Sequence, residues 1–511
     1  MNKTRLTVLG AALACVMMSA GCDDTHTVKT PVFNTGLPAF TNQASSFEKI
    51  FPRQYATYKQ NDESTVMTEY NGSSNYRKND NVHQTPPQGW KHAQPYLKNL
   101  WLGYAFAYEY NAARGHTHAV EDILEIDRIN RYAPDGKGNQ PATCWNCKTP
   151  NMVQWVQKDG DKFWSRDFNE LRENFNVYDE SISCATCHDT TNMEMKLYSI
   201  PLQDYLKRTG QDFDAMSRNE KRSLMCGQCH VEYYFAKAPG TVPNKPTFPW
   251  DNGFDVEQVY EYYQDKGENN GPFVDFVHAV SGVKILKAQH PDYETWKTGP
   301  HGTAGVSCAD CHMPYQREDG KKFSSHWWTS PLKDAEMRAC RKCHADKTPE
   351  YLRGRVLDTQ QKTFAQLLKA QEASVRAHEA VRLANEFMGE RNAEYDSLMA
   401  EAREMTRKGQ FFWDMVSAEN SVGFHNPTRQ LDALMSSAEY SQKAVELCLA
   451  ATNGAIIAGV SGDITKLVPP ILEFSREMQM DPEALKSHTW LTYMKPLPKT
   501  ERVWALNKRI K

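Results

Sequence analysis

The chain has 511 residues, which is long enough for one large domain or two ordinary ones. Its formal net charge of −3 gives no reason to expect a nucleic-acid partner. Ten of its 13 cysteines stand in five Cys-x-x-Cys pairs, and the other three, Cys15, Cys22 and Cys448, are too few and too scattered to form a disulfide framework.

The first residues have the pattern of an export signal. Lys3 and Arg5 precede an apolar run over residues 6–18, and small residues follow it up to Cys22. The apolar run is shorter than the ~20 residues that a membrane-spanning helix needs. We therefore expect residues 1–21 to be a signal peptide and the mature protein to be periplasmic. Small residues ahead of Cys22 also fit a lipoprotein signal, but Ser19 stands where an apolar residue is usual. A lipid anchor on Cys22 and a soluble form are both left open.

The remaining chain divides into three regions by composition. Residues 22–90 are polar and rich in Asn, Thr, Gln and Pro, which predicts a surface wrap with little core of its own. Residues 90–349 contain all five cysteine pairs, joined by loops and short helices. In residues 350–511, the stretch up to 410 and the stretch 427–451 predict long helices, because both are rich in helix formers. Such helices form either a self-contained bundle or a subunit interface.

Four of the five cysteine pairs are followed directly by histidine. Cys-x-x-Cys-His is the attachment sequence of c-type haem, in which both thiols form thioethers and the histidine binds iron. Zinc sites also use paired cysteines, but they do not require histidine directly after every pair. In chain order we call these the second to fifth motifs: Cys184, Cys187 and His188; Cys226, Cys229 and His230; Cys308, Cys311 and His312; Cys340, Cys343 and His344.

The first motif consists of Cys144, Cys147 and, in place of histidine, Lys148. Iron binds lysine only through its neutral amine, and removing the proton at pH 7 costs roughly 4–5 kcal/mol, which coordination must offset. An electron carrier gains nothing obvious from this cost. A haem whose opposite face is open to substrate is a better reason for an unusual ligand. Lys148 is therefore predicted to bind the iron of an open, catalytic haem, with a degenerate motif or a six-coordinate haem as the alternatives.

One Cys-x-x-Cys-Lys followed by four Cys-x-x-Cys-His strongly resembles pentahaem cytochrome c nitrite reductase, the ammonia-forming enzyme. The stretches CGQCHVEYY from Cys226 and CADCHMPY from Cys308 extend the resemblance, which runs from about residue 90 to 430. The resemblance implies five covalently bound haem c groups. It also implies a mainly α-helical fold with little β-structure, in which helices and loops wrap the multihaem cluster and long helices lie toward the C-terminus.

The resemblance further implies which histidines complete the four histidine-bound haems. One of them, the partner of the fourth motif, lies in the long-helix region and far from its motif, so His378 competes with it. The implied partners are His326 for the second motif, His116 for the third, His425 for the fourth and His301 for the fifth.

At the open haem, the resemblance implies that Arg128, Tyr233 and His290 surround the substrate. Arg131 is the alternative to Arg128, because Arg-x-x-Arg makes a slip of register easy. A guanidinium, a phenol and an imidazole would supply positive potential, hydrogen bonds and a proton source to a small anion. His290 is expected to deliver protons, because histidine changes charge near pH 7.

The resemblance also implies one calcium ion near the open haem. Its ligands would be the carboxylate of Glu232, the side-chain oxygen of Gln289 and the backbone carbonyls of Tyr233 and Lys287. Oxygen donors of this kind suit calcium, and the ion would add positive charge beside the substrate.

The expected reaction is the reduction of nitrite to ammonium with six electrons and eight protons. The resemblance implies a homodimer with the helices of 350–450 at its interface. It implies an electron donor that is either a quinol-oxidising multihaem cytochrome or a soluble cytochrome, and such a donor could hold the protein at a membrane. Two alternatives stay open from the sequence: a non-catalytic multihaem electron carrier, and a related reductase of hydroxylamine or sulfur oxyanions.

Overall fold

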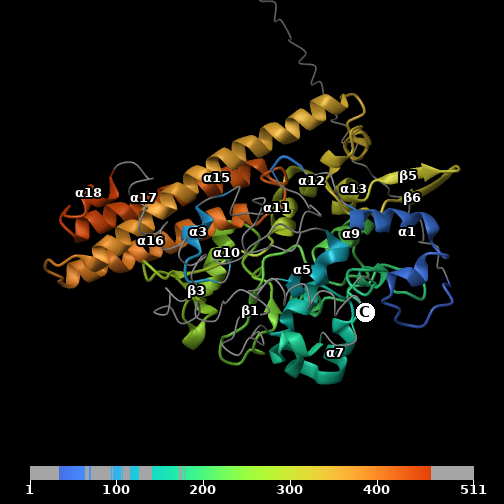
Figure 1. Cartoon of the computed structure of the whole chain (residues 1–511), viewed down its shortest axis with the longest axis horizontal. Coiled ribbons are helices and arrows are strands. Elements are labelled where there is room, and N and C mark those ends of the chain that lie inside the picture. Colours follow the sequence, from blue (N-terminus) through green and yellow to red (C-terminus); the bar gives the residue numbers. More distant parts are fainter. Residues whose placement is uncertain are drawn as a thin grey trace, which may run out of the picture.

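The computed structural model describes residues 34–63, 68–70, 94, 96–104, 106, 115–125, 141–171, 175–177 and 179–461. The predicted signal peptide, Cys22, Arg128 and Arg131 lie outside the described residues. The described chain is mainly helical, and its strands form three short antiparallel pairs (Figure 1).

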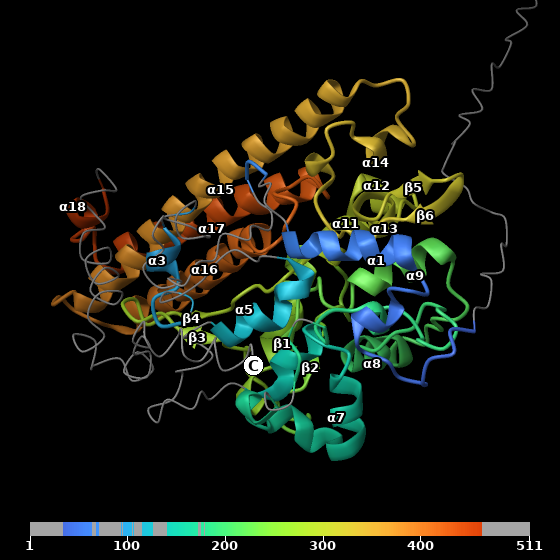
Figure 2. The same cartoon turned by 45° about the vertical axis from the view of Figure 1, so that its right-hand side comes forward.

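Three long helices lie side by side along one flank of the molecule (Figures 1 and 2). They are α15 (Pro349–Glu386), α16 (Ala393–Ser417) and α17 (Pro427–Ala451). Each begins at a side chain that accepts a hydrogen bond from the first turn, namely Thr348, Asn392 and Asn426. Proline at the first position of α15 and α17 suits a helix start, because the missing N–H has no partner there in any helix.

The largest hydrophobic core joins these helices to the rest of the chain. Trp413 and Phe411 of α16 are fully buried, and so are Trp101 and Tyr263 from the region before α15. Burying such a side chain contributes roughly 1.5–3 kcal/mol relative to leaving it exposed. The long helices are therefore a platform on which the cysteine-pair region packs.

The cysteine-pair region is built from short elements joined by loops. Its helices are α3 (Leu97–Leu100), α5 (Ala119–Glu125), α7 (Met152–Asp159), α8 (Ile200–Arg208), α9 (Arg218–Cys226), α10 (Val256–Tyr262), α11 (Asp292–Thr298), α12 (Pro300–Thr303), α13 (Cys308–His312) and α14 (Arg338–Arg341). Its antiparallel strand pairs are β1 (Tyr234–Phe235) with β2 (Pro246–Thr247), β3 (Phe276–Val277) with β4 (Lys284–Ile285), and β5 (Tyr315–Glu318) with β6 (Lys321–Ser324). A further short helix, α18 (Ile457–Val460), follows α17.

Ten 3₁₀ segments complete the described elements. They are η1 (Ala44–Phe47), η2 (Gln60–Glu63), η3 (His116–His118), η4 (Ala142–Cys147), η5 (Gly160–Ser165), η6 (Phe168–Leu171), η7 (Cys184–Thr186), η8 (Tyr263–Asp265), η9 (Glu268–Asn270) and η10 (Pro331–Lys333).

The described N-terminal segment, 34–63, lies against the cysteine-pair region and contains α1 (Pro52–Lys59). Asn61 in this segment donates a hydrogen bond to the backbone carbonyl of His326 at 2.8 Å and accepts one from the backbone N–H of Trp328 at 3.0 Å. The segment thus fixes the backbone around His326. Among the described helices, none is both long and apolar enough to cross a membrane.

Gly299, directly before α12, lies against the backbone of His425. A Cβ atom at Gly299 would stand 1.9 Å from the His425 carbonyl oxygen, whereas a Cβ at Gly354 in α15 would meet nothing within 4 Å. We expect Gly299→Ala to destabilise the protein by roughly 1–3 kcal/mol, the cost of overpacking. Gly354→Ala should be neutral or stabilise by up to about 1 kcal/mol, because alanine is the better helix former.

Thermal unfolding of the two haem-loaded variants checks this prediction. A lower Tm for Gly299→Ala together with an unchanged or higher Tm for Gly354→Ala is expected. Equal Tm values for the two variants would contradict the close approach of Gly299 to His425.

Candidate haem cluster and active site

All ten cysteines of the five motifs line one cavity of about 1940 Å³. Ligand pockets usually have volumes of ~300–1,000 Å³, so this cavity is larger than a single small ligand needs. Protein interiors are otherwise close-packed, with few voids larger than a water molecule. A continuous cavity edged by paired thiols therefore fits several large covalent groups.

Each motif forms a single helical turn, which explains its fixed spacing. In the third motif, the backbone N–H groups of Cys229 and His230 donate to the carbonyl of Cys226 at 3.1 and 3.0 Å, and the second and fifth motifs repeat this arrangement. Residues three and four apart share one face of a helical turn. Both thiols and the following side chain are thus presented to the same side, as haem attachment requires.

Contacts between cysteines of different motifs set the order of the motifs in space. Cys147 is a close neighbour of Cys229, and Cys226 is a close neighbour of Cys308. The first motif is therefore a neighbour of the third, and the third is a neighbour of the fourth. Cys187 of the second motif lies near Cys226 of the third, and Cys340 of the fifth motif lies near Cys311 of the fourth. The second and fifth motifs are therefore the outer neighbours of the third and fourth.

The histidines implied as partners face the motif histidines across the cavity. A bond from histidine nitrogen to a metal is about 2 Å, so two imidazoles on one iron have ring centres roughly 6 Å apart. The measured separations of ring centres are 5.8 Å for His116 and His230, 6.3 Å for His312 and His425, and 6.5 Å for His301 and His344. The remaining pair is His188 of the second motif and His326. These two histidines are also neighbours, because burial and then the nearby His188 lower the pKa of His326 to about 4.

Hydrogen bonds at Nδ1 leave the other ring nitrogen, Nε2, for iron. His188, His312 and His326 have Nδ1 at 2.8, 2.9 and 3.0 Å from the backbone carbonyls of Met193, Thr329 and Ser324. Histidine ligands of metals characteristically donate their second N–H in this way, which fixes the ring orientation. The bonds therefore fit iron ligation through Nε2.

His378, the competitor of His425, lies elsewhere. It is buried between α15 and its neighbours, its ring stacks on His278 with the ring centres 4.0 Å apart, and its Nε2 lies 2.6 Å from the Gln410 side-chain oxygen. His378 does not line the cavity, whereas His425, in the loop between α16 and α17, does.

Lys148, Tyr233 and His290 all line the cavity. Lys148 lies in the electrostatic surroundings of His290, and Tyr233 lies in those of Cys147 and Cys144. The three side chains therefore gather at the first motif. Burial raises the pKa of Tyr233 well above its usual value, so its phenol keeps the proton and can donate a hydrogen bond.

The charge state expected for His290 needs correction. The sequence suggested a charge change near pH 7, but burial lowers the pKa of His290 to about 3. His290 is solvent-accessible but lines the cavity, where the surrounding protein disfavours its charged form. At neutral pH the imidazole is uncharged and can donate one N–H, because burial disfavours the charged form.

The residues implied for calcium gather beside Tyr233. The Glu232 carboxylate accepts hydrogen bonds from the Gln289 backbone N–H at 2.6 Å and from the Tyr263 hydroxyl at 2.8 Å. The side-chain Nε2 of Gln289 donates a hydrogen bond to the Lys287 carbonyl oxygen at 3.0 Å. Lys287 is held in turn by a buried ion pair with Asp414 at 3.1 Å.

The electrostatics of this cluster fit a cation. Glu232 is 1% exposed, and burial, together with the nearby Glu294 and Asp275, raises its pKa well above the usual value. Buried carboxylates without a neutralising partner are costly. A divalent ion among the Glu232, Gln289 and Lys287 oxygens would supply the missing positive charge.

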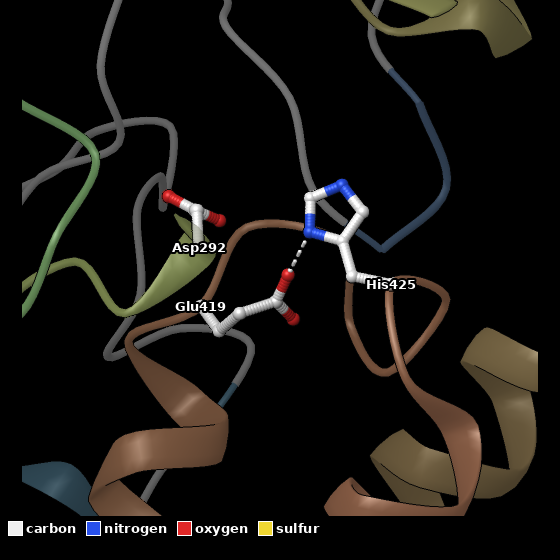
Figure 3. Close-up of side chains that lie close together, drawn as sticks. All are labelled: Asp292, Glu419 and His425. Carbon is white, nitrogen blue, oxygen red and sulfur yellow. Dashed lines mark ion pairs between the residues drawn. The ribbon is translucent and has the colours of Figure 1, made fainter. Parts of the chain in front are cut away.

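Two buried carboxylates beside the haem-facing histidines were not predicted from the sequence. Asp292 lies 3.0 Å from Nδ1 of His230, and Glu419 lies 2.6 Å from Nδ1 of His425, although that N–H is not aligned for a regular hydrogen bond (Figure 3). Burial alone would raise the pKa of Asp292, but the bond with His230 lowers it to about 2. Asp292 and His230 lie on separate parts of the chain, whereas Glu419 and His425 lie in the same loop between α16 and α17, and no motif marks either acid.

Comparisons with known proteins agree with this geometry. A model of the cytochrome c552 family matches residues 43–504. Cytochrome c nitrite reductase subunit NrfA of Nitratidesulfovibrio vulgaris strain Hildenborough is 57% identical over 513 residues, which cover 99% of this chain and 97% of that protein. Cytochrome c-552 of Bacteroides fragilis is 38% identical over 382 residues, which cover 75% of this chain and 71% of that protein.

A solved structure of cytochrome c nitrite reductase from Desulfovibrio desulfuricans has the same fold. It is 63% identical with a TM-score of 0.84, covers 92% of this chain and 99% of its own, and is described as having two calcium sites in its catalytic subunit. The mainly α-helical fold expected from the sequence is thereby confirmed. The resemblance to cytochrome c nitrite reductase is also confirmed, and with the family match over most of its length the chain belongs to the cytochrome c552 family.

Proposed function

We propose that the protein is an ammonia-forming nitrite reductase that transfers six electrons and eight protons to nitrite at a haem c bound by Lys148. The observation that carries the proposal is the single cavity lined by all five motifs, in which four of the motifs have a second histidine opposite and the first has Lys148, Tyr233 and His290. The names of close relatives support the same activity.

Haem, when bound, supplies the iron that holds the substrate and passes electrons to it. The chain's own residues position and protonate the anion. The phenol of Tyr233 and the neutral imidazole of His290 each donate a hydrogen bond to an oxygen of nitrite, in a water-poor site where such donors are strong. Arg128 adds a permanent positive charge, because its guanidinium does not lose its proton. Its assignment rests on the resemblance, with Arg131 as the alternative.

The remaining residues have supporting roles. The cysteine contacts favour a path from the outer motifs, through the third and fourth, to the first. Calcium bound by Glu232, Gln289 and the carbonyls of Tyr233 and Lys287 tethers the segment after the third motif to the segment of His290. Both segments are already joined by backbone bonds, from His290 N–H to the Val231 carbonyl and from Tyr293 N–H to the His230 carbonyl.

The setting of the protein follows from the same proposal. Residues 1–21 are its export signal, the mature enzyme works in the periplasm with or without a lipid on Cys22, and a multihaem quinol oxidase or a soluble cytochrome supplies the electrons. Residues 22–90 wrap the haem core of 90–349. The long helices of 350–450 form a homodimer interface, as the family resemblance implies.

A nitrite-dependent ammonium assay on the purified haem-loaded enzyme, with a chemical reductant, tests the function. One ammonium for each nitrite and six electrons is expected. Lys148→His should keep all five haems but lower ammonium production by roughly 10–100-fold, the scale on which changes around a metal alter activity. No ammonium from the unaltered enzyme would contradict the proposed activity, and full turnover of Lys148→His would show that lysine is not needed on iron.

The partner of the fourth motif can be tested with two matched variants. His425→Ala should convert one low-spin haem to high spin, because the iron of the fourth motif loses its sixth ligand. His378→Ala removes a buried histidine from outside the cavity and should leave the haem spectrum unchanged. Electron paramagnetic resonance on both variants checks the prediction. A new high-spin signal in His378→Ala, with none in His425→Ala, would reverse the assignment.

The calcium proposal predicts a paired loss of metal and activity. Glu232→Gln keeps the size of the side chain but removes the charge, so calcium content and nitrite reduction should fall together while five haems stay attached. Glu257→Gln, which removes a surface carboxylate paired with Lys408, is the control. Elemental analysis measures the metal. Full calcium content in Glu232→Gln would exclude its carboxylate as a ligand.

A further inference from the structure

The haem-facing histidines differ in what holds their Nδ1 atoms. His188, His312 and His326 donate to uncharged backbone carbonyls. His230 of the third motif and His425, the partner of the fourth, instead face carboxylates, those of Asp292 and Glu419. Both histidines of the second motif's haem are therefore backed by carbonyls, whereas the third and fourth each have one histidine backed by a buried acid.

Both acids are held rigidly in place. Asp292, the first residue of α11, is 6% exposed and accepts hydrogen bonds from the backbone N–H and side-chain Nδ2 of Asn420, each at 2.7 Å. Glu419 is 1% exposed and accepts from the backbone N–H and hydroxyl of Ser421 at 3.0 and 2.9 Å. Their donors keep the carboxylates aimed at the two histidines without neutralising their charge.

The two acids also belong to one cluster. Ligand-type atoms of Asp292, Glu419 and His425 lie within 4.8 Å of one another, and Figure 3 shows both carboxylates on the same side of the His425 ring. Such a group could hold a metal. Here Asp292 is already bonded to His230 and Asn420, and Glu419 to Ser421, so the carboxylates have donors within the protein. The buried Arg429 also lies in the electrostatic surroundings of Glu419.

A carboxylate that accepts the second N–H of a metal-bound histidine, as Asp292 does from His230, makes that imidazole a stronger electron donor. Glu419 acts on His425 through its nearby negative charge. Stronger donation and nearby negative charge stabilise Fe(III) relative to Fe(II), so the haem is harder to reduce. The effect is large in a buried setting, where charges are poorly screened. Only an electron is added in this step, Fe(III) becoming Fe(II), and it comes from the donor that nitrite reduction already requires.

We propose that Asp292 and Glu419 are positioning residues that lower the midpoint potentials of the third-motif and fourth-motif haems below that of the second-motif haem. The inference rests on the haem ligation in the proposed function. Because Cys147 of the first motif is a neighbour of Cys229 of the third, the more reducing third-motif haem stands directly beside the substrate-binding haem, and the fourth-motif haem stands behind it. An electron on the third-motif haem has a larger driving force for transfer to bound substrate than one on a haem of higher potential.

The test compares midpoint potentials of three haem-loaded variants. Glu419→Gln and Asp292→Asn keep the side-chain size and remove the charge, and each should shift the potential of one low-spin haem upward. Asp189→Asn is the control, because Asp189 directly follows His188 but bonds to Thr191 and Lys196 and not to a ring nitrogen. Potentiometric titration followed by electron paramagnetic resonance measures each haem separately.

The outcomes are distinct. Five haems with unmoved potentials in both variants, or an equal shift in Asp189→Asn, would overturn the inference and leave the proposed function intact. Fewer than five haems in the unaltered protein would defeat the proposed function itself. If neither variant retains its haems, the unaltered protein decides. The low-spin signal that is lost in His326→Met identifies the second-motif haem, and the inference is wrong if that signal titrates at the lowest potential in the unaltered protein.

Discussion

The whole arrangement depends on one local constraint, the helical turn that presents two thiols and an iron ligand to the same side. Five such turns face a single cavity, and the packing of the surrounding elements holds them in position. The long helices α15 to α17 supply the packed platform, because the cysteine-pair region consists of short elements around a large hollow and its own hydrophobic clusters are smaller than the one that it shares with these helices. Covalent haem would replace the missing core, which explains how a chain with a mean hydropathy of −0.68 can fold around so much buried volume.

A second constraint is electrostatic. The substrate is an anion, yet the cluster buries several acids close to it: Glu232, Glu294, Asp292 and Glu419 are all almost fully buried. Their roles separate by partner. Glu232 lies among oxygen donors and fits a cation, whereas Asp292 and Glu419 lie against histidine ring nitrogens. Buried charge is thus assigned either to a metal or to the tuning of an iron ligand, and neither use places an acid directly against nitrite.

Much of this was predictable from the sequence because the relevant signals are local. The Cys-x-x-Cys turns, the proline-started helix at 427 and the proline-free helices after 349 each follow from a few adjacent residues. The distal histidines were reached only through the family resemblance, since contacts such as His116 with His230 join distant positions. Burial overrode the ordinary titration of His290. No sequence motif marked Asp292 or Glu419. Arg128 lies outside the described residues.

The central claim is that one haem of the five, the one bound by Lys148, is open to substrate while the other four are closed by two histidines each. Electron paramagnetic resonance of the oxidised, unaltered enzyme, recorded before and after addition of nitrite, tests this claim most directly. The account predicts one high-spin haem whose signal changes when nitrite is added and four low-spin haems whose signals do not. Five low-spin signals that are all indifferent to nitrite would contradict it.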